Sequence, residues 1–426
     1  MMETIVVILL LLIIALAGAP LFTIIGAIGL LSFHAVGTDT SALIAELYRL
    51  VDLPALIAIP LFTFAGYLLA ESQAPKRLLA LAESFVGWMP GGLAVVALFS
   101  TAIFTAFSGA SGVTIIALGG LIFPALIKQN YPEKFSLGLV TTSGSLGLLF
   151  PPSLPIILYS LIAGVNIDKL FLAGLIPGFL LLLILSAYSI RIGIAAGVPR
   201  TRFQWTNVWD ALKKAAWEAP LPVIVIGGIY GGIFTATEAA AVTAFYVLVV
   251  EVFIHREIKF FSDLPRVMRE SMILVGAILV MLGTAMGVTS YLIDEQIPMK
   301  LFAFISQYVS SKIVFLMILN VFILVMNMVE IFSAIIIVVP IIVPVAMQYG
   351  VDPIHLGIIF LLNLEIGYMT PPLGLNLFLS HLRFGKPLTT VYKTVIPFFL
   401  LLLAVLVLIT YFPGLSLALS GAVGMQ

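Results

Sequence analysis

The sequence contains few charged residues and no cysteine. Of its 426 residues only 9% are Asp, Glu, Lys or Arg, whereas 62% are hydrophobic. A soluble domain carries about 25% charged residues, so a water-soluble globular protein is excluded. The lack of cysteine excludes disulfides, a thiol nucleophile and Cys-ligated zinc or iron–sulfur centres. The four histidines, at positions 34, 255, 355 and 381, are too far apart for a local metal motif.

The chain also lacks an excess of charge of either sign and a basic leader. Its formal net charge is zero, so nucleic acid is not an expected partner. The first four residues precede a long apolar run without a basic n-region, and the run is too long for a cleaved signal peptide. We expect this run to be a mature span. Because apolar sequence continues almost to the end, we predict one multi-span membrane unit.

Long uncharged runs predict the membrane spans. A helix needs roughly 20 residues to cross the bilayer core, so runs such as 53–70 and 271–293 are one span each. Longer runs must turn round or break, and clusters of Gly, Ser and Pro lie inside them at 18–20, 107–112 and 143–152. Non-helical backbone at membrane depth requires protein or a water-filled cavity around it. The clusters therefore predict protein interior, although a simple proline kink explains any one of them alone.

The two halves of the sequence are related by a shift of 220 positions without a gap. Paired prolines at one constant offset are unexpected by chance, and internal repeats of this kind are typical of transporters. The paired residues are Pro124 with Pro344, Gly147 with Gly367, Pro151 and Pro152 with Pro371 and Pro372, Ser160 with Ser380, and Pro177 with Pro397.

We therefore predict an all-α polytopic membrane protein made of inverted repeats with two re-entrant hairpins and two broken helices. If the opening runs break at 18–20 and near 235–238, each half crosses five times, and an odd number inverts one half relative to the other. The predicted parts are the first repeat (1–195, hairpin about 91–126, broken helix about 135–163), a cytoplasmic connector (196–218) and the second repeat (219–426, hairpin about 313–347, broken helix about 356–382).

The positive-inside rule supports an outside N-terminus. On this topology 16 of the 20 basic residues fall in cytoplasmic loops, and four remain outside. The first hairpin then enters from the cytoplasm and the second from outside, so that their tips meet the broken helices near mid-membrane. The inside loops are 71–83, 128–134, 191–218, 251–270 and 383–393, and the outside residues are Arg49, Lys169, Lys300 and Lys312. Segments 71–83 and 255–270 are amphipathic and predict helices lying in the interface.

Broken helices leave peptide groups unpaired, which indicates the chemistry of the site. Half-helix N-termini favour an anion such as a carboxylate, and unwound carbonyls favour a small cation. Side-chain oxygens beside the breaks are the ligands that a hard cation prefers. The arrangement favours coupled transport of an organic anion with Na⁺ or H⁺, although any one hydroxyl can instead bond back to its own helix. These oxygens belong to Ser108, Ser111, Ser143, Ser145, Asn327, Thr370 and Asn376.

Three carboxylates and one arginine lie in otherwise apolar surroundings. Glu330 and Glu365 would cost about 2.5–3.5 kcal/mol each in lipid, so they face protein or a cavity. Glu330 is expected to stabilise the second hairpin tip or a cation, and Glu365 to brace the second broken helix; alternatively each caps N–H groups at a break. Glu238 follows Thr235 in a capping box and is interpreted as structural. Arg49 is either solvated or a contact for a partner or substrate.

Five stretches resemble the large membrane subunit, the DctM-type permease, of tripartite ATP-independent periplasmic (TRAP) transporters. They extend over nearly the full length of the chain. The sequence departs from the family pattern at Ala236, where Pro is common, and at Glu330, where the family has an Asp nearby. The stretches are 59–66 (IPLFTFAG), 107–112 (FSGASG), 150–152 (FPP), 228–241 (GIYGGIFTATEAAA) and 370–376 (TPPLGLN).

The resemblance implies Na⁺-coupled uptake of a carboxylate by an elevator mechanism in the bacterial inner membrane, with no cofactor besides the coupling ion. It implies two partners, a small four-span membrane subunit and a periplasmic binding protein that delivers the substrate. The sodium-binding residues are then expected among Ser108, Gly109, Ser111, Ser143, Gly144, Ser145, Gly147, Pro151, Asn327, Glu330, Gly367, Thr370 and Pro371. Substrate-binding residues are expected among Ser111, Ser153, Gly374 and Asn376.

The sequence leaves one alternative within transport and disfavours two other functions. A stand-alone Na⁺/dicarboxylate symporter or ion exchanger of similar architecture, needing no binding protein, is the alternative within transport. An intramembrane enzyme is disfavoured because the sequence contains neither HExxH nor GxSxG, and the absence of GxxxxGK[ST] means that the chain itself does not hydrolyse ATP. A passive channel is disfavoured because hairpin-like segments suggest a closed site inside the membrane.

Overall fold

The computed structural model describes residues 10–15, 17–199, 203–326, 331–372 and 374–422, and within these ranges every regular element is helical. Seven helices among them are long and apolar enough to cross a membrane. The predicted all-α polytopic architecture is therefore confirmed. The elements are α2 (Leu21–Ala35), α3 (Ser41–Arg49), η1 (Leu50–Asp52), η2 (Pro54–Ile57), α4 (Ala58–Glu71), α5 (Ala74–Val86), α6 (Gly92–Ser108), α7 (Ser111–Thr114), η3 (Ile115–Gly119), α8 (Gly120–Lys128), α9 (Glu133–Ser143), η4 (Leu146–Leu149), α10 (Leu154–Ala163), α11 (Ile167–Ala195), α12 (Trp205–Lys214), α13 (Leu221–Tyr230), α14 (Ala236–Leu248), η5 (Val249–Ile254), α15 (Asp263–Asp294), α16 (Ile297–Ser306), α17 (Lys312–Met326), α18 (Ile331–Gln348), α19 (Pro353–Gly367), α20 (Leu375–Phe384), α21 (Leu388–Tyr411) and α22 (Gly414–Ala422).

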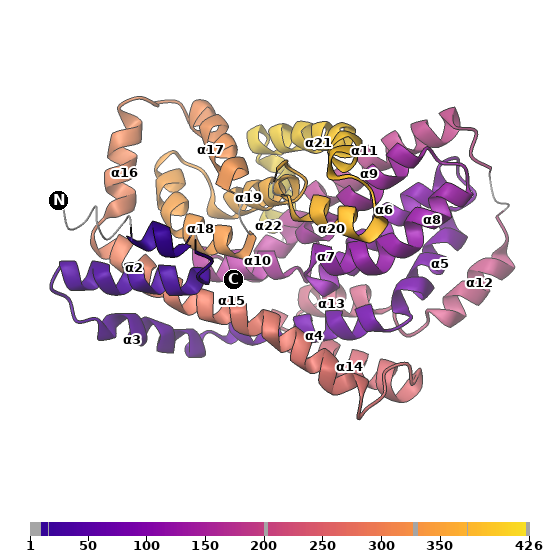
Figure 1. Ribbon diagram of the computed structural model, residues 1–426, viewed down its shortest axis with the longest axis horizontal. Coiled ribbons are helices and arrows are strands. Elements are labelled where there is room, and N and C mark those ends of the chain that lie inside the picture. Colours follow the sequence, from indigo (N-terminus) through magenta and orange to yellow (C-terminus); the bar gives the residue numbers. More distant parts are fainter. Residues whose placement is uncertain (1–9, 16, 200–202, 327–330, 373, 423–426) are drawn as a thin grey trace.

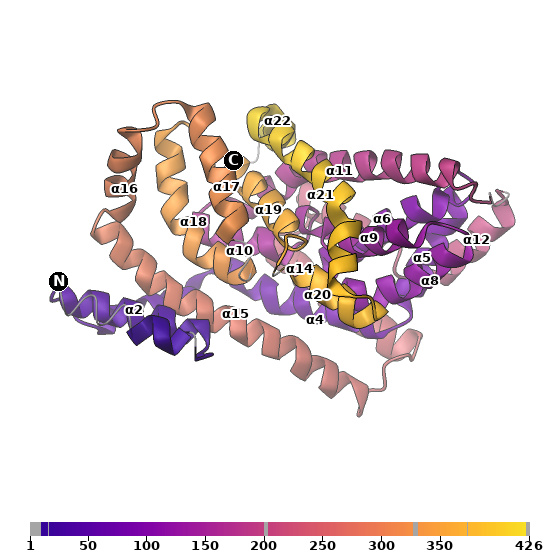
Figure 2. The same cartoon turned by 45° about the horizontal axis from the view of Figure 1, so that its top comes forward.

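The helices form two groups that lie side by side. The long helix α15 runs along one side of the molecule, with α2, α3 and α4 packed against it and α14 packed on α4 (Figures 1 and 2). We call these five helices the α15 layer. The hairpins and broken helices occupy the other side, and they contact the layer through α6 on α4 and α18 on α15.

The opening run of each half breaks where the sequence predicts. The chain leaves helical geometry before α2 at Gly18, whose φ of +89° suits glycine. In the second half α13 ends at Tyr230 and α14 starts after Thr235. The Thr235 hydroxyl accepts a hydrogen bond from the Glu238 N–H at 3.3 Å, and the Glu238 carboxylate accepts one from the Thr235 N–H at 2.8 Å. The predicted capping box is confirmed.

Helix α15 differs from the expectation for residues 255–270. A separate interfacial helix was predicted there, ahead of a span at 271–293. Instead, residues 255–262 are irregular and a single helix of 32 residues begins at Asp263. At 1.5 Å per residue it is about 48 Å long, which exceeds a hydrocarbon core of about 30 Å. The helix is therefore longer than one untilted crossing requires. The other amphipathic segment does form a separate helix, α5.

Two segments reverse direction as hairpins. The chain turns after α6 at Gly109, which has a φ of +64°, and α8 contacts α6 although 11 residues separate them. A straight continuation would hold them about 18 Å apart. In the second case the end of α18 returns to the start of α17. The Tyr349 ring stacks on Phe315 with centroids 4.1 Å apart, and the Lys312 ammonium donates to the Gly350 carbonyl at 2.6 Å.

Two helices are broken at the Gly- and Pro-rich segments. The first consists of α9, η4 and α10, and its two parts are bent by 43°. The second consists of α19 and α20, separated by residues 368–374. Positions paired by the 220-residue shift occupy similar places: Pro124 and Pro344 lie inside helices, as do Pro177 and Pro397, and each broken helix has a cis Pro–Pro bond in its gap. The inversion of the halves and their boundaries stay predictions.

A buried ion cluster joins three segments that are all predicted to be cytoplasmic. Arg77 on α5 lies 2.5 Å from Glu218, 3.3 Å from Glu251 and 2.5 Å from Glu257. Glu218 and Glu251 are fully buried, with 1% and 0% of their side chains exposed. Partial burial opposes ionisation of Glu257, but hydrogen bonds from Arg77 and the Gln73 N–H hold its pKa below the usual value.

A second ion pair, Lys386 with Glu133, joins two further loops predicted to be cytoplasmic. Five loops far apart in the sequence thus meet in two groups. These contacts agree with placing the members of each group on one side of the membrane.

We expect Arg77→Met to destabilise the protein more than the loss of an arginine from an exposed ion pair does. The substitution removes the arginine from two buried carboxyl groups, Glu218 retaining only His255 at 3.1 Å, and breaking a buried pair typically costs about 3–5 kcal/mol. The matched control is Arg266→Met, since Arg266 pairs with Glu71 where both side chains are about 40% exposed (42% and 39%), and such pairs contribute at most about 1 kcal/mol. Thermal unfolding in detergent measures both; equal losses of stability would contradict the buried cluster.

Candidate functional site

The tip of the first hairpin packs directly against the break in the first broken helix. A Cβ atom at Gly144 would lie 3.3 Å from the carbonyl oxygen of Ser111, and one at Gly109 would overlap the side chain of Leu154. Thr105, one turn before the tip, donates to the Gly144 carbonyl at 3.0 Å. The structure therefore brings together two segments that the sequence only suggested would meet.

Glycine residues permit close backbone packing around the tip and the first break. A Cβ atom at Gly147 would lie 2.4 Å from the backbone nitrogen of Ala106 on α6, a distance that real side chains do not reach. A Cβ atom at Gly66 on α4 would lie 2.5 Å from Cα of Ser108 at the tip. The tip is thus held between α4 and the first break by close backbone contacts.

The second broken helix contributes its second half to the same place. Asn376, at the start of α20, donates through its amide nitrogen to the Thr141 carbonyl at 3.1 Å and to the Ser145 hydroxyl at 3.4 Å. One turn further on, the hydroxyls of Ser380 and Thr141 are 2.8 Å apart. Three segments meet here: the hairpin tip (108–112), the first break (143–153) and the start of α20. Together we call them the break cluster.

Five of the predicted ligand residues have side-chain oxygens that are buried and lack any hydrogen-bond partner among the described residues. Each of these side chains is at most 1% exposed. A buried polar group left unpaired costs about 1–3 kcal/mol, so these five oxygen atoms are candidates for binding a ligand. The atoms are Oγ of Ser108, Ser111, Ser143 and Ser153, and Oδ1 of Asn376.

Other predicted residues behave differently. The hydroxyls of Ser145 and Thr370 donate to the carbonyls of Thr142 and Ile366, in the helices that end just before them, at 3.2 and 2.8 Å. Pro151 is buried in the first break, and Gly367 is buried at the end of α19.

The second break is more open than the first. Pro371 is exposed, whereas Gly374 is buried at the start of α20. The first break is buried almost throughout, from Ser143 to Ser153. The two predicted sites are therefore not equivalent in their surroundings.

The acidic residues of the second half differ from the hydroxyl-bearing residues of the site. Glu365 is completely buried in α19, and neither of its carboxyl oxygens has a hydrogen-bond partner among the described residues. Among the described residues, the Glu365 carboxyl therefore caps no N–H group of the second break. Asn327 and Glu330 lie outside the described residues.

Thr105, Thr141 and Ser380 are members of the site that sequence reasoning missed. The Thr105 hydroxyl links three segments. It lies 2.7 Å from the hydroxyl of Thr114, on the other arm of the hairpin, and it also bonds to Gly144 in the first break. A signal was present, since Thr101 and Thr105 are spaced one helical turn apart in an apolar run. Hydroxyls at such spacing usually bond back to their own helix, as both of these also do.

Backbone hydrogen bonds decide which polar groups remain available. In the first break the N–H groups of Leu148, Phe150 and Ser153 each donate to a carbonyl three residues earlier. In the second break the N–H groups of Gly374 and Asn376 donate to Thr370 and Tyr368. Because turns use these donors, the break cluster retains mainly oxygen atoms, which suit a small hard cation.

Comparison with known proteins gives a consistent result. The family described as "Tripartite ATP-independent periplasmic transporter, DctM component" matches residues 5–415. The C4-dicarboxylate TRAP transporter large permease protein DctM of Pseudomonas aeruginosa is 36% identical over 403 residues, covering 94% of both chains. The isethionate TRAP transporter permease protein DctMQ of Oleidesulfovibrio alaskensis is 34% identical over 412 residues, which cover 95% of this chain and 64% of that longer protein.

A solved structure shares the fold. The YdaH transporter of Alcanivorax borkumensis, described as having an unusual topology, aligns with a TM-score of 0.62 at 14% identity, covering 88% of this chain and 87% of that one.

Gly147→Ala is expected to destabilise the protein, because the added methyl group overlaps the backbone of α6. Overpacking of this kind costs about 1–3 kcal/mol. Gly276→Ala is the matched control, since its helical position in α15 has open space around the new Cβ atom. We expect the control to be neutral or slightly stabilising. Thermal unfolding in detergent compares the two, and unchanged stability of Gly147→Ala would contradict the close contact of α6 with the first break.

Proposed function

The chain belongs to the DctM family of tripartite ATP-independent periplasmic transporters, and from this we propose that it is the permease subunit of a sodium-coupled uptake system for an organic acid. The observation that carries the proposal is the set of five buried oxygen atoms without partners in the break cluster. Four are serine hydroxyl oxygens and one is an amide oxygen. Such neutral oxygen ligands bind a hard cation and release it again without a change of protonation.

The substrate would bind at the helix starts beside the cation. Ser153 precedes α10 and Gly374 precedes α20, and neither position has a side-chain cap on its helix. Helix N-termini attract carboxylates, and a neighbouring cation strengthens that attraction. Binding of the ion and of the acid are thereby linked, which is what coupled uptake requires.

The substrate class is inferred from the relatives. They are named as transporters of C4-dicarboxylate and isethionate, and each of these compounds carries an acid group. We propose an organic acid of this size for the present chain. The choice of acid would depend on the partner that delivers it.

Two protein partners and a location follow from the family. We propose that a periplasmic binding protein delivers the acid and that a small membrane subunit accompanies the permease in the bacterial inner membrane. The name DctMQ of one relative, of which this chain covers 64%, supports a second membrane component.

An elevator movement would carry the site across the membrane. In this proposal the α15 layer stays fixed, and the hairpins and broken helices move against it. The separation of the helices into two groups, joined mainly through α4 with α6 and α15 with α18, supports that division.

Substitution of the unpartnered serines is expected to weaken sodium coupling. For Ser108→Ala and Ser143→Ala we expect the sodium concentration that gives half-maximal uptake to rise about tenfold or more, because each change removes one ligand. The measurement is uptake of succinate, as a C4-dicarboxylate probe, into proteoliposomes at varied external sodium.

The matched control is Ser186→Ala. Ser186 on α11 is likewise buried and unpartnered but lies outside the break cluster. Its sodium dependence should be unchanged. Uptake that proceeds equally without a sodium gradient in the unmodified protein would rule out the coupling.

Uptake should also require the binding protein. If the acid is delivered to the permease, proteoliposomes holding the permease and its small subunit should take up succinate only when the binding protein is added outside. Uptake of similar rate without it would show a stand-alone symporter instead.

A further inference from the structure

A cavity of about 270 Å³ opens between the α15 layer and the other helices, away from the break cluster. One wall is formed by α3, η1 and α15, and the other by Leu161 and Ile162 of α10 and Ile336 of α18. Both walls are largely apolar. Leu161 is eight residues beyond Ser153 on the same helix, so the cavity lies about 12 Å along α10 from the first break.

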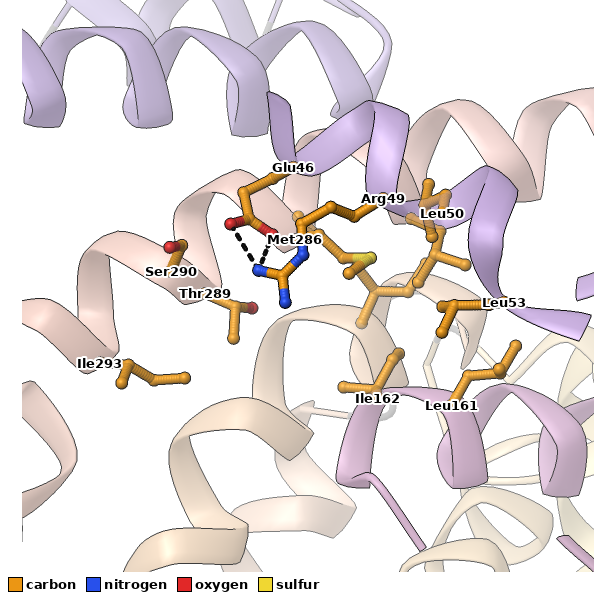
Figure 3. A pocket seen from close by; sticks show the side chains of 13 residues that line it. Glu46, Arg49, Leu50, Leu53, Leu161, Ile162, Met286, Thr289, Ser290 and Ile293 are labelled. Atoms are coloured by element: carbon orange, nitrogen blue, oxygen red, sulfur yellow. Dashed lines mark hydrogen bonds and ion pairs between the residues drawn. The ribbon is translucent and has the colours of Figure 1, made fainter. Parts of the chain in front are cut away.

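The polar groups of the cavity lie together on the wall formed by the α15 layer. Figure 3 shows the guanidinium of Arg49 pointing into the space, with Glu46 on one side and the hydroxyls of Thr289 and Ser290 on the other. Among the described residues, neither of these hydroxyls takes part in a side-chain hydrogen bond. Arg49 is also one of the four basic residues predicted to lie on the outer side of the membrane, opposite the cytoplasm.

The Arg49 side chain is only partly used. Both oxygens of Glu46 accept from the same nitrogen, Nη1, at 2.9 and 3.2 Å. Among the described residues, the other edge of the guanidinium, Nη2 and Nε, has no partner, and this edge can donate two parallel hydrogen bonds to a carboxylate. The Arg49 side chain is 71% exposed, and an ion pair in such a setting contributes at most about 1 kcal/mol, so Glu46 is readily displaced.

We propose that this cavity is an outer binding site for an organic carboxylate, held by Arg49, Thr289 and Ser290 before it reaches the break cluster. The inference rests on the proposed function for the direction of movement. The apolar wall formed by α10 and α18 would contact the carbon skeleton of the acid, and the small volume limits the ligand to a small organic acid. Because the polar wall belongs to α3 and α15, the acid would bind first to the α15 layer.

The absence of cysteine permits a direct test. Ile293→Cys places one thiol in the cavity wall without removing a polar group. The full-length permease carrying this change is labelled from outside, without sodium, by an anionic (sulfonatoethyl) or a cationic (trimethylammonioethyl) methanethiosulfonate. We expect Arg49→Gln to slow the anionic reaction about tenfold relative to the cationic one. Arg49→Lys should retain most of the preference.

Succinate tests for the ligand itself. It should slow the labelling of Cys at position 293, and Arg49→Gln should raise the succinate concentration needed for half-protection about 10- to 100-fold. Lys300→Gln is the matched control, since Lys300 is predicted on the same side but pairs with Glu295 and does not line the cavity. It should change neither the reagent preference nor the protection.

Two results would overturn the proposal. In the first, neither succinate nor isethionate protects the thiol. In the second, protection is the same with Arg49→Gln, while that variant weakens only the interaction with the binding protein, which would make Arg49 a protein contact. Because labelling requires no sodium gradient and no uptake, failure of sodium coupling would leave these outcomes readable.

Discussion

The bilayer requires every backbone polar group inside it to have a partner, and this constraint explains the arrangement of the molecule. A helix satisfies the requirement by itself, whereas a break does not. The breaks at 143–153 and 368–374 therefore need other protein around them, and the tip of the first hairpin needs the same. Stacking tip against break meets both needs at once. The result is a region inside an apolar protein where peptide and hydroxyl groups are concentrated.

Close backbone contact is what makes that region compact. Gly147 and Gly66 lie where a Cβ atom would overlap α6 or the hairpin tip. The absence of side chains there lets the hairpin tip, α6 and the first break pack backbone against backbone. Turn hydrogen bonds then occupy the N–H groups, so that oxygen atoms are what remains. Local hydrogen bonding around glycine thus leaves neutral oxygen atoms, rather than carboxylates, at the proposed site.

The sequence could predict features that depend on local chemistry. Gly18, Gly109 and the capping box of Thr235 mark element ends through their own backbone preferences, and the structure has ends there. It could not predict contacts between distant segments. The Arg77 cluster joins residues 141 to 180 positions apart, and Thr105 enters the site only because α6 meets the first break. Similarly, the length of α15 depends on loop 255–262 remaining irregular, which the amphipathic pattern did not indicate.

The repeat in the sequence does not produce two equal sites. The shift of 220 positions pairs Ser145 with Glu365, yet the Ser145 hydroxyl bonds to the Thr142 carbonyl and to Asn376, while the Glu365 carboxyl has no partner among the described residues. The first break is buried, whereas Pro371 in the second is exposed. A transporter that binds an ion and an acid needs sites of opposite electrostatic character. Two copies of one segment can supply them only if their surroundings differ, and here the surroundings differ most at the breaks.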